Sequence, residues 1–195
     1  MNNKVTNVII VGVGGQGIIL ASEILAEAVM LAGHDIRKSD VHGMAQRGGS
    51  VSSHVRFGEN VKSPLIETGT GDYMLAFEKV EGLRMSDMLK DGASIIMNEL
   101  EIVPTTVSTG SVDYPNDVVP RLREFGFNVI IVEAQELAKK AGTPKTANVV
   151  LLAALASLLD IEKNIWVEVI KHRVPQKFLD INLKAFELGY ESSKK

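Results

Sequence analysis

The sequence predicts an α/β fold of the Rossmann-like type, with a mostly parallel sheet that has helices on both faces. Short apolar runs of the buried-strand kind alternate with helical stretches as far as Val132. A glycine-rich turn, GVGGQG (12–17), separates the first apolar run from the first helix. From about residue 148 onward the chain is helical. At 195 residues, we expect one domain, with the C-terminal helices packed on it.

The predicted elements follow from local patterns. Thr6–Val11 is a buried strand, and Ile18–Leu31 is a helix that ends near Gly33. Val51–Phe57 alternates apolar and polar residues, and the extended run Val61–Ile66 follows a Gly-Glu-Asn turn, so these two segments predict a β-hairpin. Further strands are expected at Tyr73–Phe77, Ser94–Met97 and Asn128–Val132. Further helices are expected at Glu78–Leu89, Glu133–Ala141, 148–159, Glu162–His172 and Pro175–Leu188, the last one stopping at Gly189. Glu101–Val118 is expected to be a surface excursion.

Composition limits the function. The net charge of −3 argues against nucleic acid or an anionic membrane as the main partner. There is no cysteine, so the chain has no disulfide, no thiol nucleophile and no cysteine-held zinc or iron–sulfur cluster. A reducing cytoplasm fits this usage, and no signal peptide is expected. The apolar run 148–159 is shorter than the ~20 residues that span a bilayer, and we interpret it as a buried helix.

The glycine-rich turn has two interpretations. GxGxxG between a strand and a helix permits close backbone approach to an anion at the helix N-terminus. Alternatively, these glycines serve only strand–helix packing. The acid expected about 20 residues further on would be Asp35 or Asp40. Because Ile36–Ser39 is largely polar, neither acid ends an apolar strand, which disfavours NAD or FAD.

The stretch DVHGMAQRGGSVSSHVRFG (40–58) is the second candidate site. His42, Gln46 and Arg47 lie among glycines, just before Ser50 and the alternating strand. Arg47 could hold a carboxylate or phosphate, and His42 could move a proton. The alternative is an ordinary solvated loop. The sequence shows no nucleophile–base set, paired carboxylates or metal-ligand spacing, so no catalytic residue is predicted.

These segments together resemble a known family. GVGGQGIILASEILAEA (12–28), SDVHGMAQRGGSVSSHVRFG (39–58), SPLIETGTGDYMLAFEKVEGLR (63–84), TANVVLLAALA (146–156) and NLKAFELG (182–189) are similar to the gamma-type domain of 2-oxoacid:ferredoxin oxidoreductases, the pyruvate/ketoisovalerate group. The resemblance covers almost the whole chain in unbroken order. The C-terminal VPQKFLDINLKAFELG favours the indolepyruvate branch, in which this domain is the beta subunit.

The resemblance implies a subunit of an enzyme that oxidatively decarboxylates a 2-oxo acid, transfers the acyl group to coenzyme A and reduces ferredoxin. Thiamine diphosphate, Mg²⁺ and the iron–sulfur clusters would belong to a large alpha subunit, and this chain alone would hold no cofactor. The ligand-binding residues expected in the shared cleft are Gly14, Gly15, Gln16, Gly17, His42, Gln46, Arg47 and Ser50. Related fused enzymes have a lysine after the turn, where Glu23 stands here, so no coenzyme A contact is assigned to that position.

Two other functions stay open at this point. The chain could be a stand-alone NAD(P)-dependent oxidoreductase that uses the turn at 12–17, or an interaction module without a ligand. If it is a subunit, we expect the isolated chain to be inactive and to self-associate, because the surface that normally faces a partner is then exposed.

Overall fold

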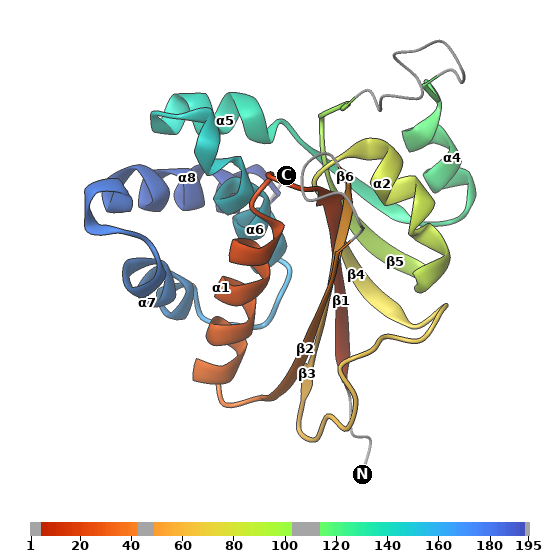
Figure 1. Ribbon diagram of the computed structural model, residues 1–195, viewed down its shortest axis with the longest axis horizontal. Coiled ribbons are helices and arrows are strands. Elements are labelled where there is room, and N and C mark those ends of the chain that lie inside the picture. The colour runs from red at the N-terminus through yellow and green to blue at the C-terminus, as the bar shows by residue number, and fades with distance from the viewer. Residues whose placement is uncertain (1–4, 43–48, 103–113, 194–195) are drawn as a thin grey trace.

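The computed structural model describes residues 5–42, 49–102 and 114–193, apart from the side chain of His42. Within these residues one sheet is flanked by helices on both faces (Figure 1). The order along the chain is β1 (Thr6–Val13), α1 (Ile18–Leu31), β2 (Asp35–His42), β3 (Ser50–Gly58), β4 (Gly71–Ala76), α2 (Lys79–Arg84), β5 (Leu89–Asn98), α4 (Val118–Glu124), β6 (Asn128–Val132), α5 (Ala134–Ala141), α6 (Ala147–Ala156), α7 (Lys163–Arg173) and α8 (Leu179–Ser192).

The six described strands lie in the order β2-β3-β1-β4-β5-β6. The pairs β1–β4, β4–β5 and β5–β6 are parallel, whereas β3 is antiparallel to both β1 and β2. Five strands therefore run in one direction and β3 runs against them. The predicted fold class, a mostly parallel sheet with one hairpin, is confirmed.

The partner in the hairpin is not the predicted one. β3 pairs with β2, which the polar residues of 35–42 did not suggest, while Val61–Ile66 is not a strand. β2 lies at the edge of the sheet, where polar and charged residues are tolerated because one side of the strand meets solvent. The backbone of 61–66 instead bonds to side chains of β3: Ile66 N–H donates to Nδ1 of His54, and Arg56 donates to the carbonyls of Ser63 and Leu65.

The second half of the sheet contains two smaller differences. The predicted helix Glu78–Leu89 stops at Arg84, and after a short 3₁₀ turn Leu89 already begins β5. The helix α4 was not predicted. Most of the predicted excursion Glu101–Val118 lies outside the described residues, and α4 begins at its last residue. The helix is held by two buried residues one turn apart, Val118 and Leu122. Together α2 and α4 cover the face of β4, β5 and β6 opposite the other helices (Figure 1).

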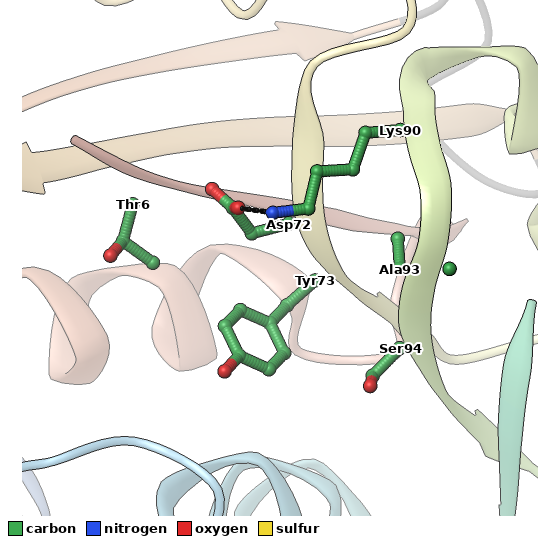
Figure 2. Close-up of a pocket in the computed structure, with 7 residues that line it drawn as sticks. Thr6, Asp72, Tyr73, Lys90, Ala93 and Ser94 are labelled. Carbon is green, nitrogen blue, oxygen red and sulfur yellow. Dashed lines mark hydrogen bonds and ion pairs between the residues drawn. The ribbon is translucent and has the colours of Figure 1, made fainter. Parts of the chain in front are cut away.

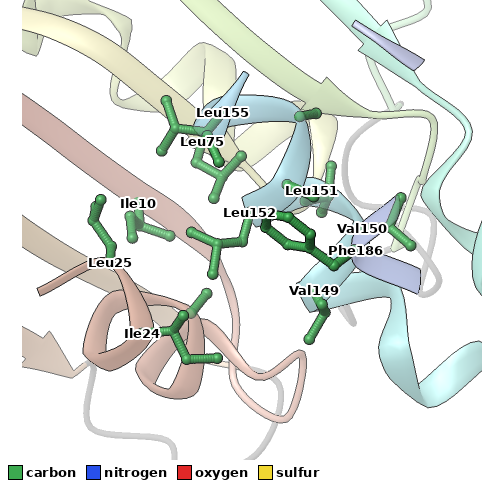
Figure 3. Packing of buried hydrophobic residues seen from close by; sticks show 14 of the residues in the cluster. Ile10, Ile24, Leu25, Leu75, Val149, Val150, Leu151, Leu152, Leu155 and Phe186 are labelled. Carbon is green, nitrogen blue, oxygen red and sulfur yellow. The ribbon is translucent and has the colours of Figure 1, made fainter. Parts of the chain in front are cut away.

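The larger core lies on the other face, around α6. All ten residues of α6 are buried, which confirms the prediction that this apolar run is an internal helix. Its leucines and valines fill the space between Ile10 of β1, Leu75 of β4, Ile24 and Leu25 of α1, and Phe186 of α8 (Figure 3). Trp166 of α7 is also fully buried, as expected for a core residue.

Gly189 was predicted to end the last helix, but α8 continues to Ser192. The glycine has a different function. A Cβ atom at position 189 would lie 2.2 Å from the carbonyl oxygen of Val150 and 2.9 Å from the Cβ of Ala153. Gly189 therefore allows α8 to lie directly against α6, and the closeness of the two helices requires a residue without a side chain.

Candidate functional site

The candidate site lies at the carboxyl ends of the parallel strands, between β1 and β4. From β1 the chain continues through α1 to β2 and β3 on one side of the sheet, while β4, β5 and β6 extend on the other side. The strand order thus diverges at β1–β4. In open α/β sheets a crevice forms outside the carboxyl ends at such a point, and ligands bind there. The glycine-rich turn ends β1 at this place (Figure 1).

Packing uses most of the glycine-rich turn. A Cβ atom at Gly12 would lie 2.5 Å from Oε1 of Gln16 and 2.7 Å from the Cβ of Phe77. Gly17 has a φ of 84°, and a Cβ there would lie 2.7 Å from Nδ2 of Asn148 on α6. Only Gly15 is exposed, and no atom comes within 4 Å of its Cβ position. An incoming group therefore has room above Gly15.

The side chain of Gln16 braces the turn. Its Oε1 accepts a hydrogen bond from the Val13 N–H at 2.6 Å, and its Nε2 donates to the carbonyl of Phe77 at 3.0 Å. Gln16 thereby ties the end of β1 to the end of β4. The structure therefore places Gln16 in the predicted turn, with both polar atoms of its side chain bonded to the protein's own backbone.

The second predicted loop begins and ends at the same edge. The Gly14 N–H donates to the carbonyl of Gly49 at 2.9 Å, and the backbone of His42 pairs with Val51 at the end of β2. The structure thus brings the Gly49 end of this loop beside the glycine-rich turn, while the His42 end lies on β2, beyond β3. The predicted residues Gln46 and Arg47, and the side chain of His42, lie outside the described part of the chain.

Ser50 forms a cluster with α2. Its hydroxyl donates to Oε2 of Glu81 at 2.6 Å and accepts a hydrogen bond from Arg84, which also pairs with Glu81 at 2.8 Å. Arg84 and Glu81 were not singled out from the sequence. Their spacing of three residues on a short helix is the signal that could have indicated an ion pair.

A hollow of about 210 Å³ lies beside Gly15 and Gln16, across the ends of β4 and β5 and the start of α6. Asn98 ends β5 inside it and is 1% exposed. The Nδ2 of Asn98 donates to the carbonyl of Phe77 at 3.2 Å, but its Oδ1 has no hydrogen-bond partner among the described residues. Asn98 therefore keeps a buried, unused acceptor at the margin of this hollow.

Two residues, one at the start of α6 and one just before it, complete this hollow. Asn148 and Lys145 both line it, and Lys145 forms no ion pair within the described chain. The lysine supplies a positive charge that can attract an anionic group. The sequence analysis missed Asn98, Lys145 and Asn148, although Asn98 directly follows a buried apolar run, which is a position typical of site residues.

A buried carboxylate organises the start of α2 at the same edge. Glu78 is 2% exposed, and its Oε2 accepts a hydrogen bond from the Glu81 N–H at 2.9 Å. Its Oε1 accepts hydrogen bonds from the Tyr114 hydroxyl at 2.6 Å and from the Ile102 N–H at 3.3 Å. Burial and this carboxylate raise the pKa of Tyr114 above its usual range, so Tyr114 stays a hydrogen-bond donor.

The strand order differs from that of a dinucleotide-binding fold. In that fold, the acid that holds the ribose ends the strand next to β1. Here the antiparallel β3 occupies that place, and β2 lies one strand further away. Asp40, near the end of β2, accepts a hydrogen bond from Ser53 at 2.6 Å and pairs with Lys38. The geometry therefore disfavours nicotinamide dinucleotide binding at the turn.

Residues 7–192 match the family described as pyruvate ferredoxin/flavodoxin oxidoreductase. This chain belongs to that family. It is 41% identical over 196 aligned residues to the indolepyruvate oxidoreductase subunit IorB of Thermococcus kodakarensis, covering 98% of this chain and 97% of that protein. It is 40% identical to the IorB subunit of Archaeoglobus fulgidus, covering 96% and 94% of the two chains.

Among solved structures, the keto/oxoacid ferredoxin oxidoreductase gamma subunit of Geobacter sulfurreducens has a similar fold. Its TM-score is 0.72 at 26% identity, with 96% of this chain and 98% of that chain covered. Both comparisons bear out the family resemblance that the sequence motifs carried.

In this oxidoreductase family member, Glu23 lies on α1 and faces α7. One of its carboxylate oxygens is 3.5 Å from a guanidinium nitrogen of Arg173. The position after the turn is thus occupied by an ion pair between helices. The described residues contain no group of three or more His, Asp or Glu that could hold a metal ion, and none of their helices is long and apolar enough to cross a membrane.

A second hollow, also about 210 Å³, lies at the opposite edge of the sheet, at the amino ends of β1, β4 and β5 (Figure 2). Its charged groups neutralise each other. Asp72 pairs with Lys90 at 2.5 Å and accepts a hydrogen bond from the Asn7 N–H at 2.8 Å. The charges of this second hollow are therefore already paired within the protein.

Proposed function

We propose that this chain is the small subunit of an indolepyruvate oxidoreductase. The observation that carries the proposal is its 40–41% identity to two IorB subunits over nearly the full length of both chains. The complex would oxidatively decarboxylate arylpyruvates, transfer the acyl group to coenzyme A and pass the electrons to ferredoxin.

We assign the redox groups of that complex to a large partner subunit. This chain contains no cysteine, so it has no thiolates with which to ligate an iron–sulfur cluster. Thiamine diphosphate and Mg²⁺ would bind to the partner as well, and the complex would act in the cytoplasm. This chain would contribute shape and polar groups, not reacting atoms.

We further propose that the carboxyl edge of the sheet faces the cleft shared with the large subunit. Support comes from the open space above Gly15, the unused acceptor of Asn98 and the lysine at position 145. The loop with His42, Gln46 and Arg47 would line the same cleft, because its Gly49 end is bonded to the glycine-rich turn. These residues would contact an anionic group of the substrate, of thiamine diphosphate or of coenzyme A.

The test is co-expression of this chain with the cysteine-rich, thiamine-diphosphate-dependent subunit encoded in the same organism. The two chains should co-purify, and the complex should reduce a viologen dye in the presence of indolepyruvate and coenzyme A. Neither chain alone should do so. Failure to co-purify, or higher activity with 2-oxoglutarate or pyruvate than with arylpyruvates, would refute the proposal.

Lys145 tests the assigned cleft within that complex. Lys145→Ala should raise KM for an anionic substrate or coenzyme A at least about fivefold, or ~1 kcal/mol, with assembly unchanged. The matched control is Lys140→Ala, because Lys140 is exposed on α5 outside the hollow. Equal kinetics for the two variants would remove Lys145 from the site.

A further inference from the structure

The outer edge of β2 is a candidate interaction surface that the proposed function does not use. β2 has eight residues and ends the sheet, and no other strand of the described chain pairs with its outer side. Val41 is 50% exposed, which is high for a valine in a strand. An edge strand of this length presents unpaired backbone N–H and carbonyl groups that another strand can bind.

β2 carries charged residues of both signs. The strand reads Asp35, Ile36, Arg37, Lys38, Ser39, Asp40, Val41 and His42. A run of like charges on an edge strand blocks pairing with a second copy of the chain, whereas charges of both signs permit pairing in selected registers. The pattern therefore contains information about which register a second copy would adopt.

Two-fold symmetry restricts the registers further. When two identical antiparallel strands extend one sheet, the symmetry axis is perpendicular to the sheet, and each pair of opposed residues must point to the same face. The residue numbers of any two opposed residues therefore have an even sum, so a residue, and not a peptide bond, lies on the axis. The two registers nearest the middle of β2 place either Lys38 or Ser39 on the axis.

Only one of these two registers is electrostatically favourable. With Lys38 on the axis, two lysines oppose each other. With Ser39 on the axis, Lys38 of each copy lies opposite Asp40 of the other copy, so the interface contains two such pairs. Lys38 and Asp40 already form an ion pair of 2.8 Å within one chain. The four side chains would therefore form a ring of alternating charge on one face of the joined sheet.

The same register also covers the exposed valine. On the other face, Arg37 would lie opposite Val41 of the second copy, and the side chain of Arg37 is 48% exposed. The aliphatic stem of an arginine can cover an apolar neighbour while its charged end stays in water. The opposite edge strand, β6, has only five residues, NVIIV, and no charge that would select a register.

We propose that two copies of this chain associate through their β2 strands, antiparallel and centred on Ser39, to form one continuous sheet. The interface is isologous, since the same strand serves both copies. Backbone hydrogen bonds provide the attraction, and the Lys38–Asp40 ring provides the register. This association also gives the expected self-association of the isolated chain a defined surface.

A single engineered cysteine tests the proposal directly, because the natural chain has none. Opposed residues in antiparallel strands have Cα atoms about 4.5–5.5 Å apart, within the roughly 4.4–6.8 Å range that a disulfide spans. Ser39→Cys should therefore form a covalent dimer under mild oxidation, about tenfold faster than Thr68→Cys, an exposed loop position on the same chain. Equal rates, together with a monomeric wild-type chain in analytical ultracentrifugation, would overturn the proposal.

Charge variants in the Ser39→Cys background test the register. Lys38→Glu surrounds the axis with four negative charges, and Asp40→Lys surrounds it with four positive charges, so each variant alone should cross-link at the Thr68→Cys rate. In an equimolar mixture, the two substituted positions lie opposite each other with opposite charges, as do the unchanged Asp40 and Lys38. The mixture should therefore recover rapid cross-linking. Thermal melts identify a variant that has lost its fold. Folded single variants that cross-link as fast as the parent Ser39→Cys chain would refute this register. The Ser39→Cys experiment tests the association itself and does not depend on the charge variants.

Discussion

At the scale of single residues, the polar side chains at the carboxyl edge mostly hold the protein's own backbone. Gln16 bonds to Val13 and Phe77, and Glu78 bonds to Glu81, Ile102 and Tyr114. A polar group that is satisfied inside the protein has less to offer a ligand. Within the described residues, Oδ1 of Asn98 has no hydrogen-bond partner and the ammonium of Lys145 has no ion-pair partner. The proposed site therefore rests on these two groups.

Arg47 carries a residue-scale prediction in the assembled enzyme. We expect Arg47→Ala to lower arylpyruvate-dependent turnover at least tenfold, about 1.4 kcal/mol, while the two subunits still co-purify. The physical reason is that a guanidinium in a desolvated cleft can form a bidentate pair with a carboxylate or phosphate. Dye reduction and co-purification yield should be measured on the same preparations.

Arg121→Ala is a suitable control for Arg47→Ala, because Arg121 forms an exposed ion pair with Asp117 on α4. The control should match the wild type. If the Arg47 variant turns over normally, the loop has no part in the reaction. If it fails to co-purify, Arg47 docks the subunits.

His54 predicts a pH dependence of stability. It is buried on β3, burial lowers its pKa, and its Nδ1 accepts the Ile66 N–H at 3.2 Å. Below about pH 6.5, the ordinary His pKa, His54 binds a proton in the unfolded chain but stays neutral in the folded chain. The free energy of unfolding therefore falls as pH falls. We expect a loss of ~1 kcal/mol from this group between pH 7.5 and pH 5.5, measured by urea unfolding.

His54→Asn isolates this contribution. The Oδ1 of asparagine can accept the same N–H but does not titrate, so the variant should lose about 1 kcal/mol less than the wild type over that interval. The other three histidines, His34, His42 and His172, are the same in both proteins, so the difference between the two profiles isolates His54. Parallel pH profiles for the two proteins would show that His54 does not couple protonation to folding.

At the scale of elements, the partner strand of β3 differs from the predicted one, because side chains of β3 bond to the backbone of the predicted partner. The predicted partner of β3 was 61–66, but His54 and Arg56 take the backbone groups of that segment. The polar segment 35–42 pairs with β3 instead. The alternation of β3 was correctly interpreted as a strand with two different faces, but alternation alone does not state which neighbour the strand will have.

The contact between α6 and α8 gives the element-scale prediction. We expect Gly189→Ala to destabilise the chain by about 2 kcal/mol or more, because the added methyl group meets the backbone of α6 and the two helices must separate. Intrinsic helix propensity would predict the opposite sign, since alanine favours a helix by about 1 kcal/mol over glycine. Thermal or urea unfolding measures the difference.

Lys184→Ala is the control on the same helix, at an exposed position of α8. It should change the free energy of unfolding by no more than about 0.5 kcal/mol. A Gly189→Ala protein that is as stable as the wild type, or more stable, would show that α6 and α8 can move apart at no cost.

At the scale of the whole molecule, strand order decides which ligand the glycine-rich turn can serve. We predict that the purified chain binds NADH no more tightly than a Kd of about 100 µM. The antiparallel β3 separates β1 from β2, and Asp40 is bonded to Ser53 and Lys38. Calorimetric titration checks this prediction, and a Kd in the low micromolar range would contradict it.

Several elements followed from the sequence because local and tertiary preferences agree in them. The buried run of β1, the helix after the glycine-rich turn and the fully buried, mostly apolar α6 were predicted within a few residues. α4 was missed because its apolar signal consists of two residues one turn apart. Asn98, Lys145 and Asn148 were missed because they come from separate segments, and only the packed sheet brings them to one hollow.

The sequence by itself determined the fold class, the family and the absence of thiol ligands, because periodicity, motif order and residue counts are properties of the chain alone. Tertiary structure decided which strand stands beside β1, which polar atoms are already used and why position 189 must be glycine. Each of these depends on a neighbour distant in the sequence. A hydrogen bond or a close packing contact needs both partners, so it is determined only when the folded chain brings the two segments together.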